Sequence, residues 1–424
     1  MLYFRQVEAK QKLQFGASLM IEKLSYRWAM LGLGWLAYFS FGMINTSLAP
    51  LTLIIRSDLN LTYTQFGTIL GAWPLTYIAV SYVEGIMIDR FGIRKSVAVG
   101  VLLLALSVFL RSFAVDFATL FAAVAVFGLG GPMISIGLPK LIALWFSGRE
   151  RGTAAGIYMT GSTLGNSFSL ALTNSVIFPL TGSWQNTFRM YAVGALAIAV
   201  IWYILGRDIP QFGDDNKGVK NQSTGGNFAK VMHFRDVWVV VIIGFAAFVI
   251  LHGLRNWLPL IFELNGMTAA DAGFLASLPS LIGVVGSIAL NRMAVRLNSK
   301  KPLILTLLAV TGVGIYIMGT STGLVLWVSL IVYGFCSGAL TPLMMLVLMD
   351  NRDVGKELMG AAGGLYFTIG EIGGFSGPFI MGYVKDYTGS FLFGIILLAV
   401  FVEVMLIPAF ILRERKSTSA QRAN

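Results

Sequence analysis

Charged residues are scarce in this chain of 424 residues: Asp, Glu, Lys and Arg together make up 12% of it, whereas 56% is hydrophobic. A soluble domain carries about twice that share of charge, because its surface must face water. The shortage of charge therefore excludes an ordinary soluble domain. It predicts a protein that crosses a membrane several times.

Cysteine is almost absent as well. The single cysteine, Cys336, lies in an apolar run, which excludes an intrachain disulfide and a metal site built from cysteine clusters. The sequence also lacks a nucleotide-binding P-loop, the spacing of a catalytic triad and a cluster of metal ligands. We therefore expect no enzyme activity, no cofactor and no metal.

Long apolar runs are what the chain has in abundance. A helix needs about 20 apolar residues to cross a bilayer, and we count twelve runs of that kind. The sequence therefore predicts an all-α integral membrane protein with twelve transmembrane helices. The runs lie at 28–55, 64–87, 95–113, 117–146, 151–177, 187–206, 236–262, 271–293, 302–320, 323–349, 358–383 and 389–412.

A polar stretch rich in Gly, Ser and charged residues separates the first six runs from the last six, and its composition predicts a flexible linker. The expected organisation is a cytoplasmic N-terminal segment, a six-helix bundle, a cytoplasmic linker, a second six-helix bundle and a cytoplasmic tail. These parts cover residues 1–27, 28–206, 207–235, 236–412 and 413–424.

The distribution of Lys and Arg fits this count of helices. With both termini placed in the cytoplasm, 25 of the 31 basic residues fall in cytoplasmic segments and four in outer loops, namely Arg56, Arg111, Arg189 and Lys385. Such a bias is typical of membrane proteins. The net charge of +11 therefore orients the chain in a lipid bilayer, and we expect no nucleic-acid partner.

The two halves of the chain resemble each other. At an offset of 206 residues, Gly85–Lys95 falls on Asn291–Lys301, with basic residues in matching places but Val295 opposite Asp89. At an offset of 208, the glycine-rich segment Gly152–Tyr158 falls on Gly360–Tyr366. Internal repeats are frequent in transporters, and here they predict two homologous bundles.

The link between the second and third helices carries a motif that resembles the major facilitator superfamily. The resemblance implies that the two bundles rock about a central site by alternating access, and that Asp89 and Arg90 latch the cytoplasmic side in the outward-facing state. The residues that match the motif are Gly85, Asp89, Arg90, Gly92, Arg94 and Lys95.

The second copy of this motif lacks the acid, which predicts asymmetric gating. We expect Asp89→Asn to impair transport and to favour the inward-open state, and we expect Val295→Asp not to compensate. Two other positions depart from the family. Val124 stands where proton-linked members often carry arginine, and the segment Gly161–Asn166 lacks the proline of drug antiporters.

Ionisable side chains inside membrane spans are candidates for function, because hydrocarbon does not solvate them. Glu371 lies near the middle of helix eleven, where it could carry a proton or form a structural ion pair. In helix seven, Arg255 could bind a carboxylate with two hydrogen bonds, beside His252 and Asn256, or it could be an outer-gate residue bonded to loop carbonyls. The phrase Asn256–Pro259 resembles organic-anion and cyanate-type permeases.

Other polar side chains could line the same cavity. Asn45 occupies a depth similar to that of Arg255, while Tyr158 and Tyr366 match across the two halves and could also serve packing. Lys140 could contact substrate, but we expect it to pair with Glu84 or to anchor a loop. Glu403 in the last helix has no assigned role.

These features predict a secondary transporter in the plasma membrane of a prokaryote. We expect a monomer that moves a small organic anion, with a carboxylate as the leading candidate and a proton as the candidate coupling ion. One alternative is an exporter of an amphipathic or drug-like compound. The alternative of another class is a membrane sensor that keeps the fold without transporting.

Overall fold

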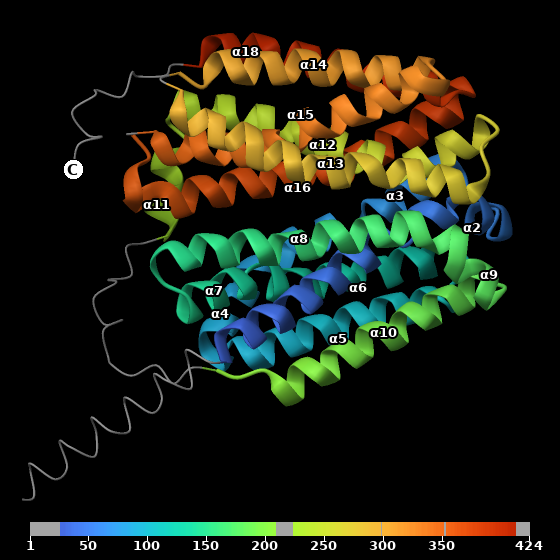
Figure 1. Ribbon diagram of the computed structural model, residues 1–424, viewed down its shortest axis with the longest axis horizontal. Coiled ribbons are helices and arrows are strands. Elements are labelled where there is room, and N and C mark those ends of the chain that lie inside the picture. Colours follow the sequence, from blue (N-terminus) through green and yellow to red (C-terminus); the bar gives the residue numbers. More distant parts are fainter. Residues whose placement is uncertain (1–25, 209–223, 298, 352, 413–424) are drawn as a thin grey trace, which may run out of the picture.

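The computed structural model describes residues 26–208, 224–297, 299–351 and 353–412. Regular structure in these ranges is helical, and the membrane helices form two bundles of six. The bundle from the first half of the chain lies below the bundle from the second half in Figure 1. The predicted fold class is thereby confirmed.

In the first half, a helix over residues 26–45 is followed by η1 (Ala49–Leu51), α2 (Thr52–Asp58), α3 (Tyr63–Leu70), α4 (Ala72–Phe91), α5 (Ile93–Arg111), α6 (Phe117–Ser135), α7 (Gly137–Trp145), α8 (Gly148–Leu172), η2 (Thr173–Ile177), α9 (Phe178–Thr181) and α10 (Trp184–Leu205). Several spans are built from two pieces, so that α3 and α4 form the second membrane helix, and α6 and α7 form the fourth.

The second half contains α12 (Arg235–Leu264), α13 (Ala269–Arg296), α14 (Lys301–Thr320), α15 (Gly323–Asp350), α16 (Gly355–Thr388), α17 (Phe391–Val404) and α18 (Leu406–Ile411). The linker also contains a helix, α11 (Thr224–Val231). The prediction of a flexible linker is wrong for this segment, because Val231 is buried and α11 packs against α16. Residues 209–223 lie outside the described part of the chain.

Ten of the membrane helices are apolar enough to span a bilayer by composition alone. The remaining two are the fifth, built around α8, and the eleventh, α16. Both are glycine-rich, and both lie along the junction between the bundles, where α8 contacts α13 and α16 contacts α3 and α4. Their weaker hydrophobicity follows from this position, since one face of each meets the other half of the protein.

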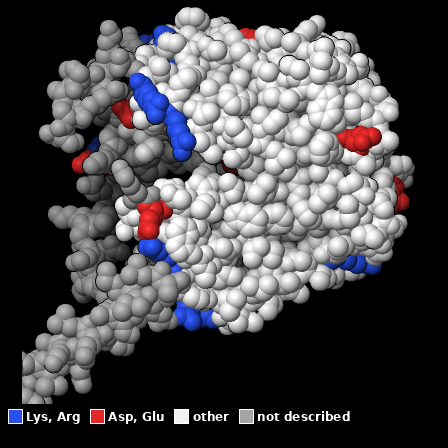
Figure 2. All heavy atoms as spheres, viewed as in Figure 1, with Lys and Arg blue, Asp and Glu red and all other residues white. Residues whose placement is uncertain are grey.

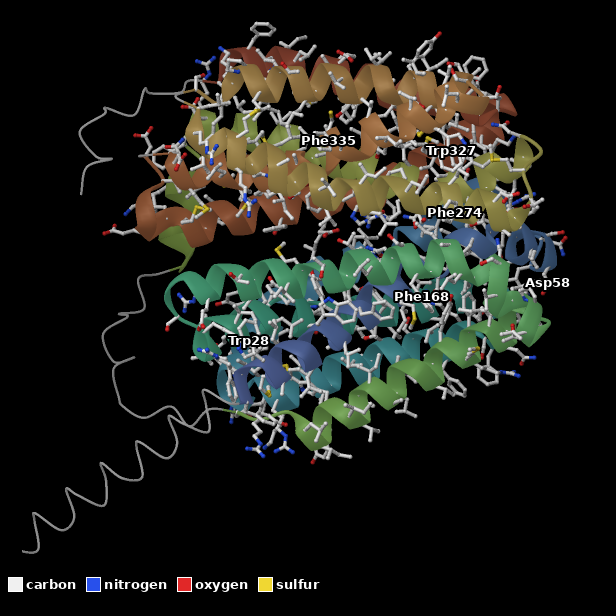
Figure 3. The ribbon with its side chains drawn as sticks, viewed as in Figure 1. Trp28, Asp58, Phe168, Phe274, Trp327 and Phe335 are labelled. Atoms are coloured by element: carbon white, nitrogen blue, oxygen red, sulfur yellow. The ribbon has the colours of Figure 1, made fainter. Side chains whose placement is uncertain are left out.

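The two ends of the molecule differ. We call the end where α10 finishes and α12 begins the linker end, and the opposite end the far end; Trp28 marks the first and Asp58 the second in Figure 3. In Figure 2 the surface is hollowed between the two halves at the left, which is the linker end. The described ion pairs near this end join helices within one half.

At the far end, helices of the two halves pack with their backbones in direct contact. A Cβ atom added to Gly67 of α3 would lie 2.4 Å from the carbonyl oxygen of Pro378 in α16. A Cβ atom on Gly273 of α13 would lie 2.3 Å from the carbonyl oxygen of Leu170 in α8. Any larger side chain would push the halves apart there. The structure is therefore closed at the far end and open at the linker end.

One basic residue lies elsewhere than predicted. Arg111, counted above with the outer loops, is the last residue of α5 and is only 1% exposed. Its guanidinium donates hydrogen bonds to the carbonyl oxygen of Ile44 at 3.0 Å and to Ser47 Oγ at 3.0 Å. The first helix ends just there, and the Ile44 carbonyl also accepts hydrogen bonds from the Ser47 amide at 3.3 Å and from Ser47 Oγ at 2.9 Å. Arg111 adds a charged donor to this helix end from inside the bundle.

We expect Arg111→Met to lower the free energy of unfolding by about 2 kcal/mol, because a buried carbonyl and a hydroxyl lose a charged donor. Thermal unfolding of the purified protein in detergent measures the effect. Arg189→Met is the matched control, because Arg189 is exposed on α10, where it donates a hydrogen bond to the nearby Asn186 side chain at 3.0 Å and lies over the Phe113 ring at 5.3 Å. Equal melting temperatures for both variants would contradict the capping role.

Candidate functional site

Midway along the molecule, α12 and α16 of the second half face the first helix and α4 of the first half. On α12, the residues Phe248, His252 and Arg255 are spaced by four and three positions, so that they share one helix face. Glu371 lies near the middle of α16. Three of the predicted site residues therefore come together: Arg255, His252 and Glu371.

Arg255 and Glu371 form the charged part of this site. Their charges attract each other, but the two groups make no direct ion pair. Arg255 Nε and Glu371 Oε2 are both buried without a hydrogen-bond partner. Buried polar atoms are usually paired, so each of these two atoms is able to accept a further partner without breaking an existing contact.

The imidazole of His252 lies between aromatic rings of the two halves. Its ring centroid is 6.0 Å from that of Phe248 and 5.6 Å from that of Trp73, which belongs to α4. Gly374 makes room for this arrangement, since a Cβ atom there would lie 2.8 Å from Glu371 Oε2 and 3.4 Å from His252 Cδ2. The histidine and the carboxylate thus border the same small space.

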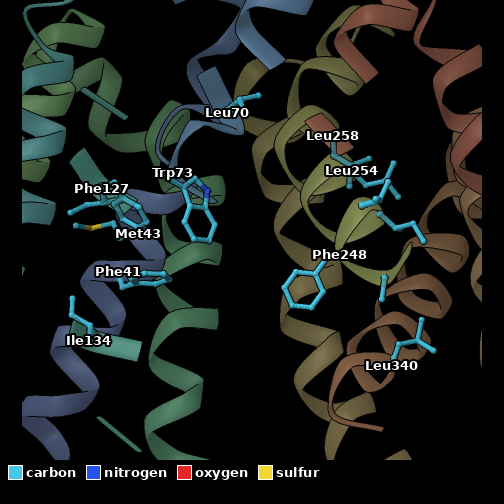
Figure 4. Packing of buried hydrophobic residues seen from close by; sticks show 14 of the residues in the cluster. Phe41, Met43, Leu70, Trp73, Phe127, Ile134, Phe248, Leu254, Leu258 and Leu340 are labelled. Carbon is cyan, nitrogen blue, oxygen red and sulfur yellow. The ribbon is translucent and has the colours of Figure 1, made fainter. Parts of the chain in front are cut away.

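The first half contributes an aromatic wall opposite these groups. Trp73 packs edge-on against Phe127 at 5.6 Å and against Tyr77 at 6.0 Å, and Phe41 lies 6.2 Å from the same tryptophan. Figure 4 shows Trp73 and Phe41 on one side of the junction and Phe248 on the other. These rings carry no charge, so the ionic groups of the site belong to the second half.

Two tyrosine hydroxyls add polar atoms to the aromatic wall. Tyr77 shares a hydrogen bond of 2.7 Å with Ser135, and Tyr38 packs against Tyr158 in a tilted arrangement with ring centroids 5.7 Å apart. Tyr38 also lies against Phe41, with ring centroids 5.5 Å apart, so that both tyrosines belong to the wall. An anion beside Arg255 would therefore meet charge on one side and flat rings with hydroxyl groups on the other.

The other predicted residues lie outside this cluster. Asn256 donates a hydrogen bond to the carbonyl oxygen of His252 at 2.8 Å, within its own helix. Asn45 is half-buried at the end of the first helix. Tyr158 touches the wall only through Tyr38, and Tyr366 is fully buried against Gly244 and Phe248. In the described structure these four side chains therefore lie around the charged cluster and not within it.

Lys140 lies near the linker end, away from the central cluster. Its ammonium group bonds the carboxylate of Asp89 at 2.5 Å. The prediction that Lys140 pairs with Glu84 is wrong, because Glu84 is buried one turn deeper in α4 and its Oε2 has no partner. The depth along α4 decides the pairing, and Asp89 rather than Glu84 reaches the level of Lys140.

The motif between α4 and α5 is held to its own half. Gly92 adopts a positive φ of 85°, which allows the sharp turn between the two helices. The Arg94 amide donates to Asp208 at 2.9 Å, and its guanidinium donates to the carbonyl oxygen of Tyr203 at 2.6 Å. Arg90 lies over the ring of Phe91, while Lys95 is exposed and Gly85 has open space around it.

The second half has an equivalent ion pair with the charges exchanged. Val295 stands at the position matching Asp89, but it is 62% exposed and its apolar side chain forms no ion pair. Lys300, at the start of α14, instead bonds Asp350 at the end of α15. In the first half the acid, Asp89, lies next to the loop and the lysine, Lys140, lies on the fourth membrane helix. In the second half the lysine, Lys300, lies next to the loop and the acid, Asp350, ends α15. The repeat alignment of the loop alone could not reveal this exchange.

Sequence reasoning missed the aromatic wall. Trp73, Tyr38 and Tyr77 are not among the residues predicted from the sequence. Aromatic residues form 12% of the chain, so that their presence in a span carries little signal. The packing of α4 against α6 and of the first helix against α8 decides which rings face the junction.

Comparisons with known proteins agree with this architecture. The sequence profile described as Major Facilitator Superfamily matches residues 33–378. The chain is 24% identical over 395 residues to the "Hexuronate transporter" of Bacillus subtilis (strain 168), covering 87% of this chain and 92% of that protein. It is 25% identical over 386 residues to the "Probable galactarate/D-glucarate transporter" of the same organism, covering 80% and 81%.

Among solved structures, a bacterial homologue of the human lysosomal transporter Spinster, in an inward-facing and unoccupied conformation, superimposes with a TM-score of 0.73. The match covers 91% of this chain and 97% of that one at 15% sequence identity, and it concerns the fold. Together with the profile match and the two bundles of six helices, these findings show that the chain belongs to the Major Facilitator Superfamily.

Proposed function

We propose that this membrane transporter carries a small organic anion through a site at Arg255, by alternating access and together with a proton. The observation that carries the proposal is the half-buried side chain of Arg255, which keeps a buried, unpartnered Nε next to a carboxylate it does not directly contact. Arginine binds carboxylates with two parallel hydrogen bonds. The names of the relatives mention hexuronate, which has one carboxylate, and galactarate, which has two, and both support an organic anion.

The orientation follows from the bias of the basic residues. The linker end gathers most of the Lys and Arg residues, which favours the cytoplasm. The far end then faces the outside of the plasma membrane. In this orientation the closed far end and the open linker end correspond to an inward-facing state, in which the site exchanges substrate with the cytoplasm.

The proposed coupling uses competition for Arg255. Without substrate, the carboxylate of Glu371 is the acidic group whose charge attracts the Arg255 guanidinium. When a carboxylate of the substrate binds Arg255, two anions would share one cation in a buried place, which is unfavourable. A proton on Glu371 removes this conflict. One proton and one anion would then cross together, and each would leave when the other leaves.

The same reasoning favours a substrate with one carboxylate. Among the described side chains of the site, those able to carry charge near neutral pH are Arg255, His252 and Glu371. Their sum exceeds one positive charge only if His252 and Glu371 hold a proton at the same time. A second carboxylate on the substrate would lie against Trp73 and Phe41, where no cation offsets its desolvation.

Uptake into proteoliposomes tests this proposal. We expect radiolabelled glucuronate, with one carboxylate, to enter at least about tenfold faster than glucarate, which has the same carbon skeleton and two carboxylates, because the second charge is buried unpaired. An inward proton gradient should accelerate the entry. Equal rates for the two acids would contradict the single-carboxylate preference. Absence of uptake across a wider panel of organic acids would contradict anion transport itself.

The aromatic wall favours a second candidate, an exporter of an amphipathic compound. Flat rings such as Trp73 and Phe41 bind apolar molecules without needing a charge. This candidate predicts efflux driven by a proton gradient and little dependence on Arg255. A dye-efflux assay with the Arg255→Ala variant separates the two functions, because an exporter would keep its activity in that variant.

A further inference from the structure

An acidic residue joins the two halves at the far end. Asp386, near the end of α16, accepts hydrogen bonds from the backbone amides of Tyr63 at 3.1 Å and Thr64 at 2.7 Å, and from Thr64 Oγ1 at 2.6 Å. Tyr63 and Thr64 are the first two residues of α3. A carboxylate of the second half thus caps a helix N-terminus of the first half.

This contact is not needed to begin the helix. Thr62 already caps α3, accepting a hydrogen bond from the Gln65 amide at 3.1 Å, and the Gln65 side chain accepts one from the Thr62 amide at 3.0 Å. Asp386 takes the two amides that this capping box leaves free. The positive end of the helix dipole adds an attraction for the carboxylate. The added bonds therefore serve the closure between the halves.

The surroundings fix this carboxylate in place. A Cβ atom on Gly382, one turn before Asp386, would lie 2.2 Å from the carbonyl oxygen of Tyr63, so that only a glycine lets α16 come so close. The Tyr63 ring lies under two cations, Arg56 at 4.0 Å and Lys385 at 5.5 Å from its centroid. The end of α16 and the start of α3 thus form one interlocked contact.

The sequence carries the same pattern at the opposite end of this helix pair. Gly382, Asp386 and Gly389 have the spacing of Gly85, Asp89 and Gly92. In both cases the last glycine ends its helix with a positive φ, of 75° and 85° respectively. The second and eleventh membrane helices run antiparallel across the junction, and each carries an aspartate near its C-terminal end.

We propose that Asp386 locks the far end of the transporter: it binds the start of α3 while that end is closed and releases it when that end opens. Asp89 occupies the corresponding place at the linker end, where the structure is open and where this carboxylate bonds Lys140 of its own half. The lock at the far end is made of a charge and a helix terminus. Such a contact is weak enough to be broken in every cycle.

Distances between spin labels test the lock without any substrate. The background is Cys336→Ser, which removes the only cysteine. Labels at Leu180→Cys and Leu324→Cys, both strongly exposed at the far end of different halves, report on its opening. We expect Asp386→Ala, in lipid nanodiscs, to raise the ratio of long to short distances about tenfold, the size expected for the loss of a charged helix cap.

Two further variants make the experiment decisive. Thr64→Val removes the hydroxyl partner from the other half, and should shift the distances in the same direction by a smaller factor. Asp271→Asn is the matched control, because Asp271 lies in the first turn of α13 at the same end, and its carboxylate accepts a hydrogen bond from Oγ1 of the N-cap residue Thr268 at 2.7 Å, within its own half. It should leave the distances unchanged.

The lock is overturned if Asp386→Ala keeps the wild-type distances, or if Asp271→Asn shifts them as much. Melting temperatures of the three variants show whether a general loss of stability has occurred. Because the labels need no substrate, failure here leaves the proposal of anion transport intact. Failure of anion transport in the uptake assay likewise leaves this lock untouched.

Discussion

Arg255→Ala is expected to reduce uptake of the organic anion at least about a hundredfold, since truncating one partner of a buried charged contact costs several kcal/mol. The reason lies in the geometry of the site. The Nε atom of Arg255 is buried without a hydrogen-bond partner, and the facing wall of aromatic rings offers an anion no other positive charge. Radiolabelled uptake into proteoliposomes measures the loss, with the reconstituted amount of each variant determined on gels.

Arg255→Lys separates charge from geometry. Lysine keeps the positive charge but not the flat pair of donors, so we expect partial activity with a raised KM. Arg189→Ala is the control for basic residues in general, because Arg189 is exposed far from the site. If Arg255→Ala transports at the wild-type rate, the anion does not bind where we place it, and the exporter candidate gains support.

Most of the fold could be predicted from the sequence, because a bilayer imposes a length on every span. The predicted runs agree with the helices to within about five residues. The largest deviation occurs in α16, which extends from Gly355 to Thr388 beyond the predicted 358–383. Its C-terminal end carries Lys385 and Asp386, which a hydrophobicity criterion excludes from a membrane helix. The closure at the far end depends on just these residues.

The candidate site could be predicted only in part. Arg255, His252 and Glu371 stand out because ionisable groups are rare within spans. Their neighbours could not be found in this way, since Trp73 is one of many aromatic residues and its importance depends on which face of α4 meets the other half. Arg111 shows the opposite error, because a basic residue at the end of a span was assigned to a loop although it folds back into the bundle.

Distances along helices limit such predictions further. Lys140 and Glu84 lie on neighbouring helices, and the sequence suggested that they pair. The structure instead places Asp89 within 2.5 Å of Lys140. One turn of a helix, about 5.4 Å, separates a correct from an incorrect partner. From a single sequence, the depth of a residue in the membrane can be predicted only to about one helical turn, about 5.4 Å.

Glu371→Gln is the second substitution with a large expected effect, and it acts on coupling more than on binding. Glutamine has the size of the protonated glutamic acid but cannot exchange a proton. We therefore expect substrate exchange across the membrane, with labelled substrate outside and unlabelled substrate inside, to continue at a rate close to that of the wild type. Accumulation driven by a proton gradient should be lost, where the wild type would gain about tenfold per pH unit.

Glu403→Gln provides the matched control for this prediction. Glu403 is also a carboxyl group within a membrane helix, but it lies on α17 against Gly312 of α14, away from Arg255. Loss of its charge should leave accumulation unchanged. If Glu371→Gln still accumulates substrate in response to a proton gradient, the proton travels by another group. If it loses exchange and accumulation together, Glu371 contributes to binding itself and the competition for Arg255 does not operate.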